Sequence, residues 1–302
     1  MQLVRLLPPL DPGKPGDGGI VPDGSIVRNV AAKRAVTLGG LPAVLLQLAH
    51  PMVAQGVSDY SDFERDPLAR MISTLDATLV MTFGDHEQAG EKVAKVRLTH
   101  QSVHGELTQT HGEWRRGERY SALNAELCLW VYATGVELVL DTYSALCSPL
   151  SPTARAEYYE GGKPLAELMG VKRSILPATY PQFRSYYQDM LGRLVVGPMA
   201  RDIAAAIFAA RLGPVPVSPL GPVIAAALLP GERMRQAYRL RWGWREQAMW
   251  QAFRLAAGTV ARLAPPLVSE WPHARVARQR SAAPAAKAAA PIGVAGSSGS
   301  EP

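Results

Sequence analysis

Two histidines, His100 and His104, are the residues of this sequence best suited to chemistry. Residues 87–105 predict a helix, because apolar residues and a histidine recur on one face at the period of an α-helix. That face contains Val93, Val96, His100 and Val103, and His104 lies one turn beyond His100. A histidine among valines needs a partner, since an unpaired buried polar group costs roughly 1–3 kcal/mol. A backbone carbonyl would serve, and so would a metal. The iron of a haem suits a ligand that aliphatic side chains surround.

A third histidine, His50, lies within an apolar stretch that predicts a helix from residue 43 to residue 54. This helix is apolar on nearly all sides, which predicts burial. Pro51 cannot donate a hydrogen bond to the carbonyl of Gln47, so we expect a kink beside His50. Gln47 and His50 share a face, and either side chain could reach a cofactor from there.

Arg70 and Thr74 lie four residues apart on the next predicted helix and therefore on neighbouring positions of its surface. Asp66 is suited to cap the start of this helix and Pro67 to occupy its first turn. Gly84-Asp85 ends the helix, and the His100 helix follows directly.

The composition is that of a globular protein. The chain has 302 residues, is 47% hydrophobic and 19% charged, and carries a formal charge of +6. Only two cysteines occur, which argues against a disulfide framework and favours a reduced, cytoplasmic setting. The basic residues are spread out, so nucleic-acid binding is not expected. No signal peptide is expected either. Two uncharged runs, at 35–58 and 212–230, are too interrupted for membrane spans, although the second leaves room for peripheral contact with a lipid surface.

Helical patterns without strand alternation predict an all-α fold in a single domain. We expect an irregular N-terminal arm at 1–28, a helical domain at 29–268 and a disordered tail at 269–302. The tail is rich in Ala, Pro, Gly and Ser and has few large apolar side chains that could pack against the domain. Residues 111–119 are expected to form a polar loop. The predicted helices cover 43–54, 67–83, 87–105, 124–147, a segment opening at 151–152, 163–169, 180–192, 198–211, 222–228, 231–239 and 244–263.

The order of several short motifs resembles one family. These motifs are Leu38-Gly-Gly, Leu45-Leu-Gln-Leu-Ala-His-Pro51, Gly56-Val57, Asp66-Pro-Leu-Ala-Arg70 with Thr74, Phe83-Gly84, Val96-Arg-Leu-Thr-His100 with Val103, Tyr120-Ser-Ala-Leu, Leu129-Trp-Val-Tyr-Ala-Thr134, Leu176-Pro-Ala-Thr179 and Leu228-Leu-Pro230. The sequence is similar to the haem-binding oxygenases that include latex clearing protein (rubber oxygenase) and the ER-bound MpaB-type oxygenase of mycophenolic acid biosynthesis. The resemblance covers roughly Ser25 to Arg262.

The resemblance implies a globin-like helical core around a buried pocket for a b-type haem, with His100 as the proximal iron ligand. It implies that Arg70 and Thr74 lie close to the haem, and that the partners are O2 and an apolar, isoprenoid- or lipid-like substrate. Two positions depart from the family. Rubber oxygenases have a lysine where this chain has Ser73, and many relatives have a histidine where it has Tyr132. Cleavage of polyisoprene is therefore not carried over.

Each candidate residue could also have a purely structural role. His50 could lie on the distal side of a haem, or it could satisfy backbone groups freed by Pro51. Arg70 could bind a haem propionate or form a salt bridge to Asp66 or Asp76. Thr74 could bond only to its own helix. His104 is expected to support the site rather than to bind iron, because many relatives have arginine there. We expect three further histidines, His86, His111 and His273, to be solvated.

Three functions agree with these patterns. The first is a haem-dependent oxygenase, in which Arg70, Thr74 and His50 are the candidate catalytic residues and His100, Arg70, Thr74, His104 and Gln47 the candidate cofactor-binding residues. The second is a protein that holds haem or a hydrophobic ligand without turnover. The third is a non-haem metal site on His50, His100 and His104. The sequence leaves the oligomeric state open.

Overall fold

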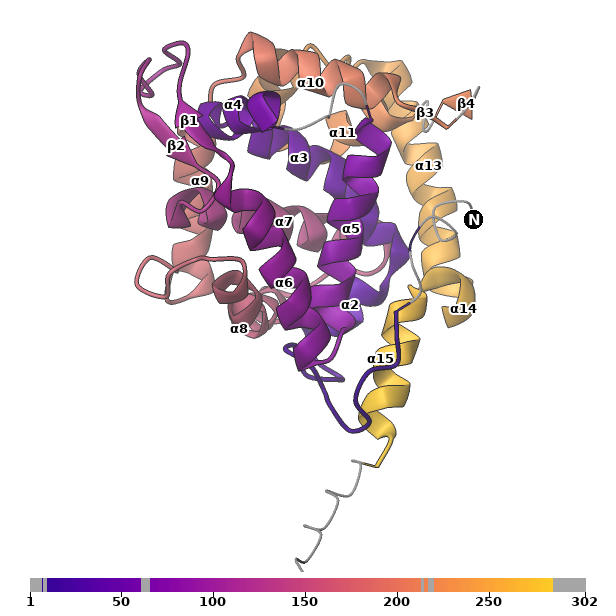
Figure 1. Cartoon of the computed structure of the whole chain (residues 1–302). Helices are drawn as coiled ribbons and strands as arrows, with labels where there is room; N and C mark the ends of the chain where they lie inside the picture. The colour runs from indigo at the N-terminus through magenta and orange to yellow at the C-terminus, as the bar shows by residue number, and fades with distance from the viewer. Residues whose placement is uncertain (1–6, 8–9, 61–65, 213–214, 217–219, 285–302) are drawn as a thin grey trace, which may run out of the picture.

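The structure is a computed structural model, and it describes residue 7 and residues 10–60, 66–212, 215–216 and 220–284. It confirms the all-α, single-domain fold (Figure 1). The helices are α2 (Ile26–Ala32), the 3-10 helix η1 (Arg34–Gly39), α3 (Gly40–Leu48), α4 (Pro51–Tyr60), α5 (Pro67–Phe83), α6 (His86–Gln101), α7 (Ala125–Leu146), α8 (Pro152–Leu168), α9 (Tyr180–Arg193), α10 (Pro198–Ala209), α11 (Gly221–Leu228), α12 (Gly231–Ala237), α13 (Trp244–Leu263), α14 (Pro266–Ser269) and α15 (Pro272–Ala282).

Helix α7 is the centre of the core. Trp130, Ala133 and Leu140 on α7 are fully buried, and the helix is covered by η1, α3, α8, α9 and α13. An α-helix that is apolar on most sides can be stable in water only when neighbours surround it, so the pattern of residues 127–133 dictates this central position. Asn124 caps the helix by accepting from the amides of Glu126 and Leu127.

The predicted kink at Pro51 is confirmed. The segments Arg34–Leu48 and Pro51–Tyr60 meet at an angle of 102°. The carbonyls at the end of α3 find partners from outside the helix, as buried helix ends require. The Tyr238 hydroxyl donates to the Leu45 carbonyl (2.5 Å) and the Trp130 indole to the Leu46 carbonyl (3.3 Å). Within the described residues no single helix is long and apolar enough to cross a membrane, and this bent pair alone meets the length and composition test.

Several predicted boundaries are wrong. Helix α2 begins at Ile26, inside the arm at 1–28 that was predicted to be irregular. The His100 helix ends at Gln101, and His104 begins a strand, β1 (His104–Glu106), which pairs antiparallel with β2 (Arg119–Ser121). A second small pair joins β3 (Arg211–Leu212) to β4 (Val215–Pro216). The segment 163–169 is not a separate helix, because α8 continues through Pro164. Strand β1 was missed because its partner lies far along the chain, beyond the reach of local patterns.

The C-terminal boundary at residue 268 also moves. Pro272–Ala282, inside the predicted disordered tail, forms helix α15, which packs against α5 and α2. Ala274 and Ala277 are buried there. Part of the predicted tail therefore belongs to the domain, while residues 285–302 lie outside the described residues.

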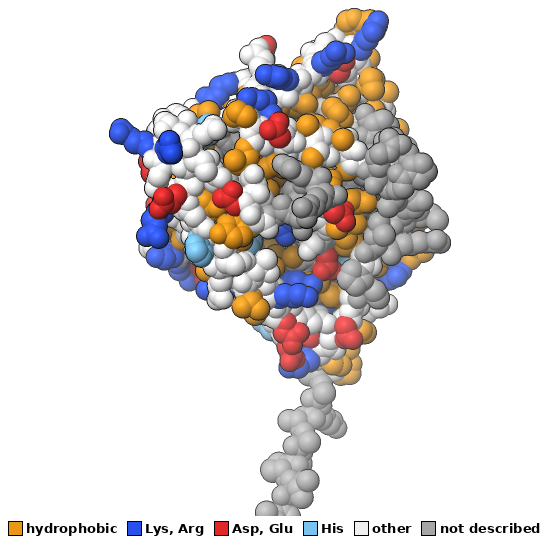
Figure 2. Space-filling model, turned by 45° about the horizontal axis from the view of Figure 1, so that its top comes forward, with side chains coloured by type: hydrophobic (Ala, Val, Ile, Leu, Met, Phe, Trp, Pro, Cys, Tyr) orange, Lys and Arg blue, Asp and Glu red, His pale blue; other side chains and the backbone are white. Residues whose placement is uncertain are grey.

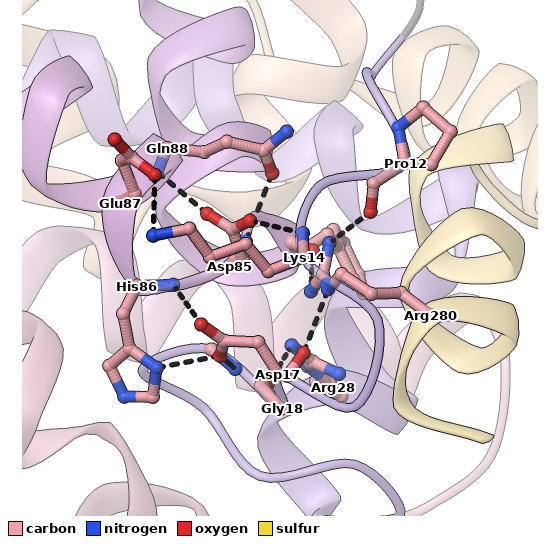
Figure 3. Close-up of polar contacts among 12 residues, drawn as sticks. Pro12, Lys14, Asp17, Gly18, Arg28, Asp85, His86, Glu87, Gln88 and Arg280 are labelled. Atoms are coloured by element: carbon pink, nitrogen blue, oxygen red, sulfur yellow. Dashed lines mark hydrogen bonds and ion pairs between the residues drawn. The ribbon is translucent and has the colours of Figure 1, made fainter. Parts of the chain in front are cut away.

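Two buried arginines join α15 and the N-terminal arm to the end of α5 (Figure 3). Arg280 donates to the carbonyls of Phe83 (2.8 Å) and Asp17 (2.8 Å), and Arg28 donates to those of Thr82 (3.3 Å) and Gly18 (2.6 Å). Cations suit the carbonyl end of a helix, where the last C=O groups lack partners within the helix. Both ends of the domain thus hold the turn that connects α5 to α6.

Arg280→Ala should lower the free energy of unfolding by about 2 kcal/mol, because it leaves the Phe83 and Asp17 carbonyls without this charged donor. Arg278→Ala is the matched control on the same helix. Arg278 is 46% exposed and pairs with Glu270 (2.8 Å), and surface pairs of this kind contribute about 0–1 kcal/mol. Urea unfolding of both variants makes the comparison. Equal losses would show that the buried contacts of Arg280 do not stabilise the domain.

Candidate functional site

The antiparallel helices α5 and α6 bring Arg70 and His100 together. Both residues lie at nearly equal distances along the chain from the Gly84-Asp85 turn, so they come level when the helices pack side by side (Figure 1). The start of each helix is fixed by an aspartate. Asp66 accepts from the Ala69 amide, and Asp85 forms a capping box with Gln88. Local sequence therefore sets the register of the pair.

The environment of His100 keeps its imidazole neutral. Burial lowers the pKa of His100, and the positive charge of Arg70 lowers it further. The inward stripe is confirmed for the residues within α6, because Val93 is buried and Val96 and His100 are partly buried. Val103 is partly buried but lies beyond the end of the helix at Gln101. A neutral imidazole offers the free lone pair that a metal needs, whereas an imidazolium does not.

Thr74 follows Arg70 by one turn on α5, and its hydroxyl donates to the Arg70 carbonyl (3.0 Å). Thr78 and Thr82 continue this pattern, each donating to the carbonyl four residues earlier. Hydrogen bonds of this kind hold threonines within their own helix. This geometry agrees with the interpretation in which Thr74 bonds only to its own helix. Both Thr74 and Ser73 are exposed, so the position at which rubber oxygenases have a lysine carries a small hydroxyl that faces outward here.

His50 has structural partners at the kink. Its Nδ1 accepts from the Met52 amide (3.3 Å), and its ring packs against Trp114 with 4.7 Å between ring centroids. The guanidinium of Arg193 lies over the Trp114 ring, 5.8 Å from its centroid. Burial, together with the charge of Arg193, lowers the pKa of His50 to about 4. The geometry favours a structural role for His50, because its ring accepts from the Met52 amide at the start of α4. The Gln47 carbonyl, which Pro51 leaves without a donor, accepts from the backbone amide of His50 (3.1 Å).

The buried neutral His50 should make the fold sensitive to acid. Its pKa is about 4 in the folded state and about 6.5 in the unfolded chain, so the unfolded chain binds the extra proton between these values. Stability should therefore fall as the pH drops from about 6.5 to about 4, by up to about 1 kcal/mol per pH unit from this group. In His50→Phe this slope should shrink. Urea titrations at several pH values measure it, and an unchanged slope would rule out His50 as its source.

The other predicted ligands lie apart from this arrangement. His104 is exposed in β1, where its carbonyl accepts from the Tyr60 hydroxyl (2.7 Å). Gln47 donates through Nε2 to the Thr134 hydroxyl on α7 (2.9 Å). Among the described residues, no three His, Cys, Asp or Glu side chains form a group that could hold a metal ion. The structure therefore does not assemble His50, His100 and His104 into a non-haem metal site.

Several buried polar groups were not singled out as functional from the sequence. The Tyr132 hydroxyl and one oxygen of Glu137 are buried without hydrogen-bond partners among the described residues, and the other Glu137 oxygen pairs with Arg184. Burial raises the pKa of both groups, although Arg184 opposes the effect on Glu137. The sequence did contain a signal for Glu137, because a carboxylate between Val136 and Leu138 in an apolar helix indicates a buried charge that needs a partner. His273, expected to be solvated, is buried at 3% exposure.

Two hollows in the surface are lined by other residues. One lies between α10, α11 and the start of α13 and includes Phe208, Tyr238 and Arg241. The other lies beside α5 and α6, further along the helix pair, and includes Asp76 and Lys92. Neither of these two hollows is lined by Arg70 or His100.

The residues at Arg70 and His100 fit a haem in their chemistry. The set offers one neutral imidazole as an axial ligand and one guanidinium, which can hold a propionate carboxylate through charge-assisted hydrogen bonds. Val93 and Val96 on the same stripe of α6 add apolar surface beside this pair.

Comparison with known proteins agrees with the resemblance. The family model described as "ER-bound oxygenase mpaB/B'/Rubber oxygenase, catalytic domain" matches residues 27–262, close to the predicted Ser25 to Arg262. No curated protein and no solved structure matches the chain. Since the match covers well over half of the chain, the protein belongs to this family of oxygenase catalytic domains.

Proposed function

We propose that this member of the oxygenase family is an enzyme that uses haem b, bound through His100, to oxygenate an apolar substrate of isoprenoid or lipid type. The observation that carries the proposal is the neutral, partly buried imidazole of His100 beside the Arg70 guanidinium, within a chain that belongs to an oxygenase family. A bound haem would supply the activation of O2.

The residues of the chain would bind and orient this cofactor. His100 would give Nε2 to the iron, with Nδ1 left for a second acceptor that fixes the ring. Arg70 would bind a propionate and keep His100 deprotonated by its charge. Met71, which follows Arg70 and packs against the main core, would help to keep water from this region.

The residues at positions 73 and 74 restrict which substrate the enzyme could oxygenate. A threonine hydroxyl that donates to Arg70 can still accept a hydrogen bond, and so can orient a polar ligand. Ser73 cannot act as the lysine of rubber oxygenases does, because a serine hydroxyl is neither cationic nor an effective base at neutral pH. Polyisoprene is therefore not the proposed substrate.

A second candidate is a protein that carries haem or a hydrophobic ligand without turnover. The observation in its favour is Ser73 itself, since the chain has no ionisable group at the position of the family lysine. Oxygen consumption by the haem-loaded protein, with a reductant and a panel of terpenoid and fatty compounds, separates the two. Substrate-dependent uptake with an oxygenated product supports the enzyme. A coloured protein that binds these compounds but consumes no oxygen above the rate without them supports the carrier.

Arg70→Ala should weaken haem retention and also raise the pKa of His100, because the variant removes the positive charge that disfavours the imidazolium. The pKa is measured by NMR titration of the haem-free protein and so does not depend on the cofactor. Arg70→Lys should keep the lowered pKa but recover haem retention only in part, since lysine lacks the bidentate fork of arginine. Equal haem occupancy in wild type and Arg70→Ala would exclude a role for Arg70 in cofactor binding.

A further inference from the structure

Large apolar side chains are exposed along α13 and α14, which lie together at one side of the molecule (Figure 1). We call these residues the α13–α14 face. Its most exposed apolar members are Trp244 (75%), Leu255 (65%), Val260 (53%), Leu263 (79%), Leu267 (68%) and Val268 (51%). Scattered exposed apolar residues are ordinary, but six large ones along the two consecutive helices α13 and α14 are typical of an interaction surface.

The face is not the side by which α13 joins the domain. Trp250, Phe253 and Ala261 form that inner side, and they pack with Val223 and Leu146. A helix on the surface normally carries polar residues opposite its buried stripe. Here the opposite side contains Leu255, Leu263 and the exposed small residues Ala248, Ala252 and Ala256. The helix is therefore apolar on a second side that no described residue covers.

The charges on this face have one sign. Arg245, Arg254 and Arg262 are exposed on or beside it, and Arg245 lies 5.3 Å from the ring centroid of Trp244. The single carboxylate between residues 244 and 268 is Glu246, which caps α13 by accepting from the Gly243 amide (2.8 Å). Figure 2 shows one view of the whole molecule, in which hydrophobic side chains lie among those of Lys, Arg, Asp and Glu.

We propose that the α13–α14 face is a docking surface for the anionic headgroup region of a phospholipid membrane. Apolar residues with Trp and Leu, flanked by arginines, are the features of helices that lie in the membrane interface. The apolar side chains would enter the boundary of the acyl chains, and the arginines would meet lipid phosphates. This surface is distinct from the segment 212–230 suggested by the sequence, whose helix α11 buries Val223, Ile224, Ala225 and Ala226. Residues 213–214 and 217–219 of that segment lie outside the described residues.

A second copy of the chain fits the face less well than lipid does. A two-fold contact through α13 would bring the arginines of both copies into one interface, and the face itself offers no free carboxylate to pair with them. Burying unpaired like charges opposes association. An anionic membrane provides the missing negative charge at the same depth as the arginine side chains.

The test is binding of the full-length protein to phosphatidylcholine vesicles with and without phosphatidylglycerol, measured by flotation. The wild type should bind the anionic vesicles and bind them less at high salt. Leu263→Ser/Leu267→Ser/Val268→Ser and Arg245→Gln/Arg262→Gln should each weaken this binding about tenfold or more. Because the replaced side chains are exposed, both variants should keep the circular dichroism spectrum of the wild type.

The matched control is Leu123→Ser/Arg115→Gln, which changes an exposed leucine and an exposed arginine on a different part of the surface and should bind as the wild type does. Absence of wild-type binding to either vesicle would overturn the proposal, as would an equal loss in the control. A dimer in solution that the triple serine variant converts to a monomer, without vesicle binding, would assign the face to a second copy. The measurement needs no turnover, so its outcome is independent of the proposed haem chemistry.

Discussion

His100→Ala is expected to give a folded helical protein that no longer retains haem. The side chain belongs to the partly buried stripe of α6, so truncation removes the proposed axial ligand but little of the core. Loss of groups that merely support a metal ligand typically lowers metal affinity 10–100-fold. Loss of the ligand itself should lower haem affinity by more than about 100-fold. Absorption spectra after haem titration give the affinity, and circular dichroism confirms the fold.

Two other histidine variants serve as controls for His100→Ala. His104→Ala should keep haem, because His104 is exposed in β1 and lies outside the helix. His50→Phe should also keep haem, with a small change in stability from the lost bond to the Met52 amide. If His50→Phe loses haem while His100→Ala keeps a normal Soret band, the proposed ligand is wrong and the two histidines exchange roles.

Gly39→Ala should destabilise the domain by about 3 kcal/mol or prevent folding, although it adds one methyl group. A Cβ at this buried position would lie 2.8 Å from the Leu138 carbonyl oxygen and 2.5 Å from the Thr142 hydroxyl, both on the central helix α7. Backbone of a central helix cannot move away without disturbing its other neighbours. The change should lower the midpoint of urea unfolding without altering the slope.

The adjacent glycine is the matched control. Gly40 is exposed, has helical backbone angles, and a Cβ built there meets no atom within 4 Å. Gly40→Ala should therefore be neutral or stabilise the protein by up to about 1 kcal/mol. The two substitutions add the same atoms to neighbouring residues, so a difference between them isolates the contact with α7. Similar stabilities for both variants would show that η1 can move away from α7.

Local sequence was sufficient for much of this fold. Asp66 and Pro67 predicted the start of α5, and Pro51 predicted the kink that the structure places between α3 and α4. In each case the signal is steric or a hydrogen bond within a few residues, so it does not depend on the rest of the chain. The stripe around His100 was predicted for the same reason.

The misplaced elements depend on partners that are distant in the chain. His104 was assigned to a helix because the apolar period continues past Gln101, but pairing with Ser121 draws it into a strand. The segment of α15 was assigned to a disordered tail because of its composition, yet Arg280 is anchored by carbonyls of the N-terminal arm and α5. His273, expected in solvent, is buried on the same helix. Contacts between residues that are distant in the chain cannot be predicted from the pattern of neighbouring residues.

The absorption spectrum of the purified protein after addition of haem decides whether His100 binds a haem iron. We expect a Soret band that shifts when the iron is reduced and carbon monoxide is added, with one haem bound per chain in the wild type and none retained in His100→Ala. A wild-type protein that binds no haem, or a Soret band that is the same in wild type and His100→Ala, would contradict the proposed haem site.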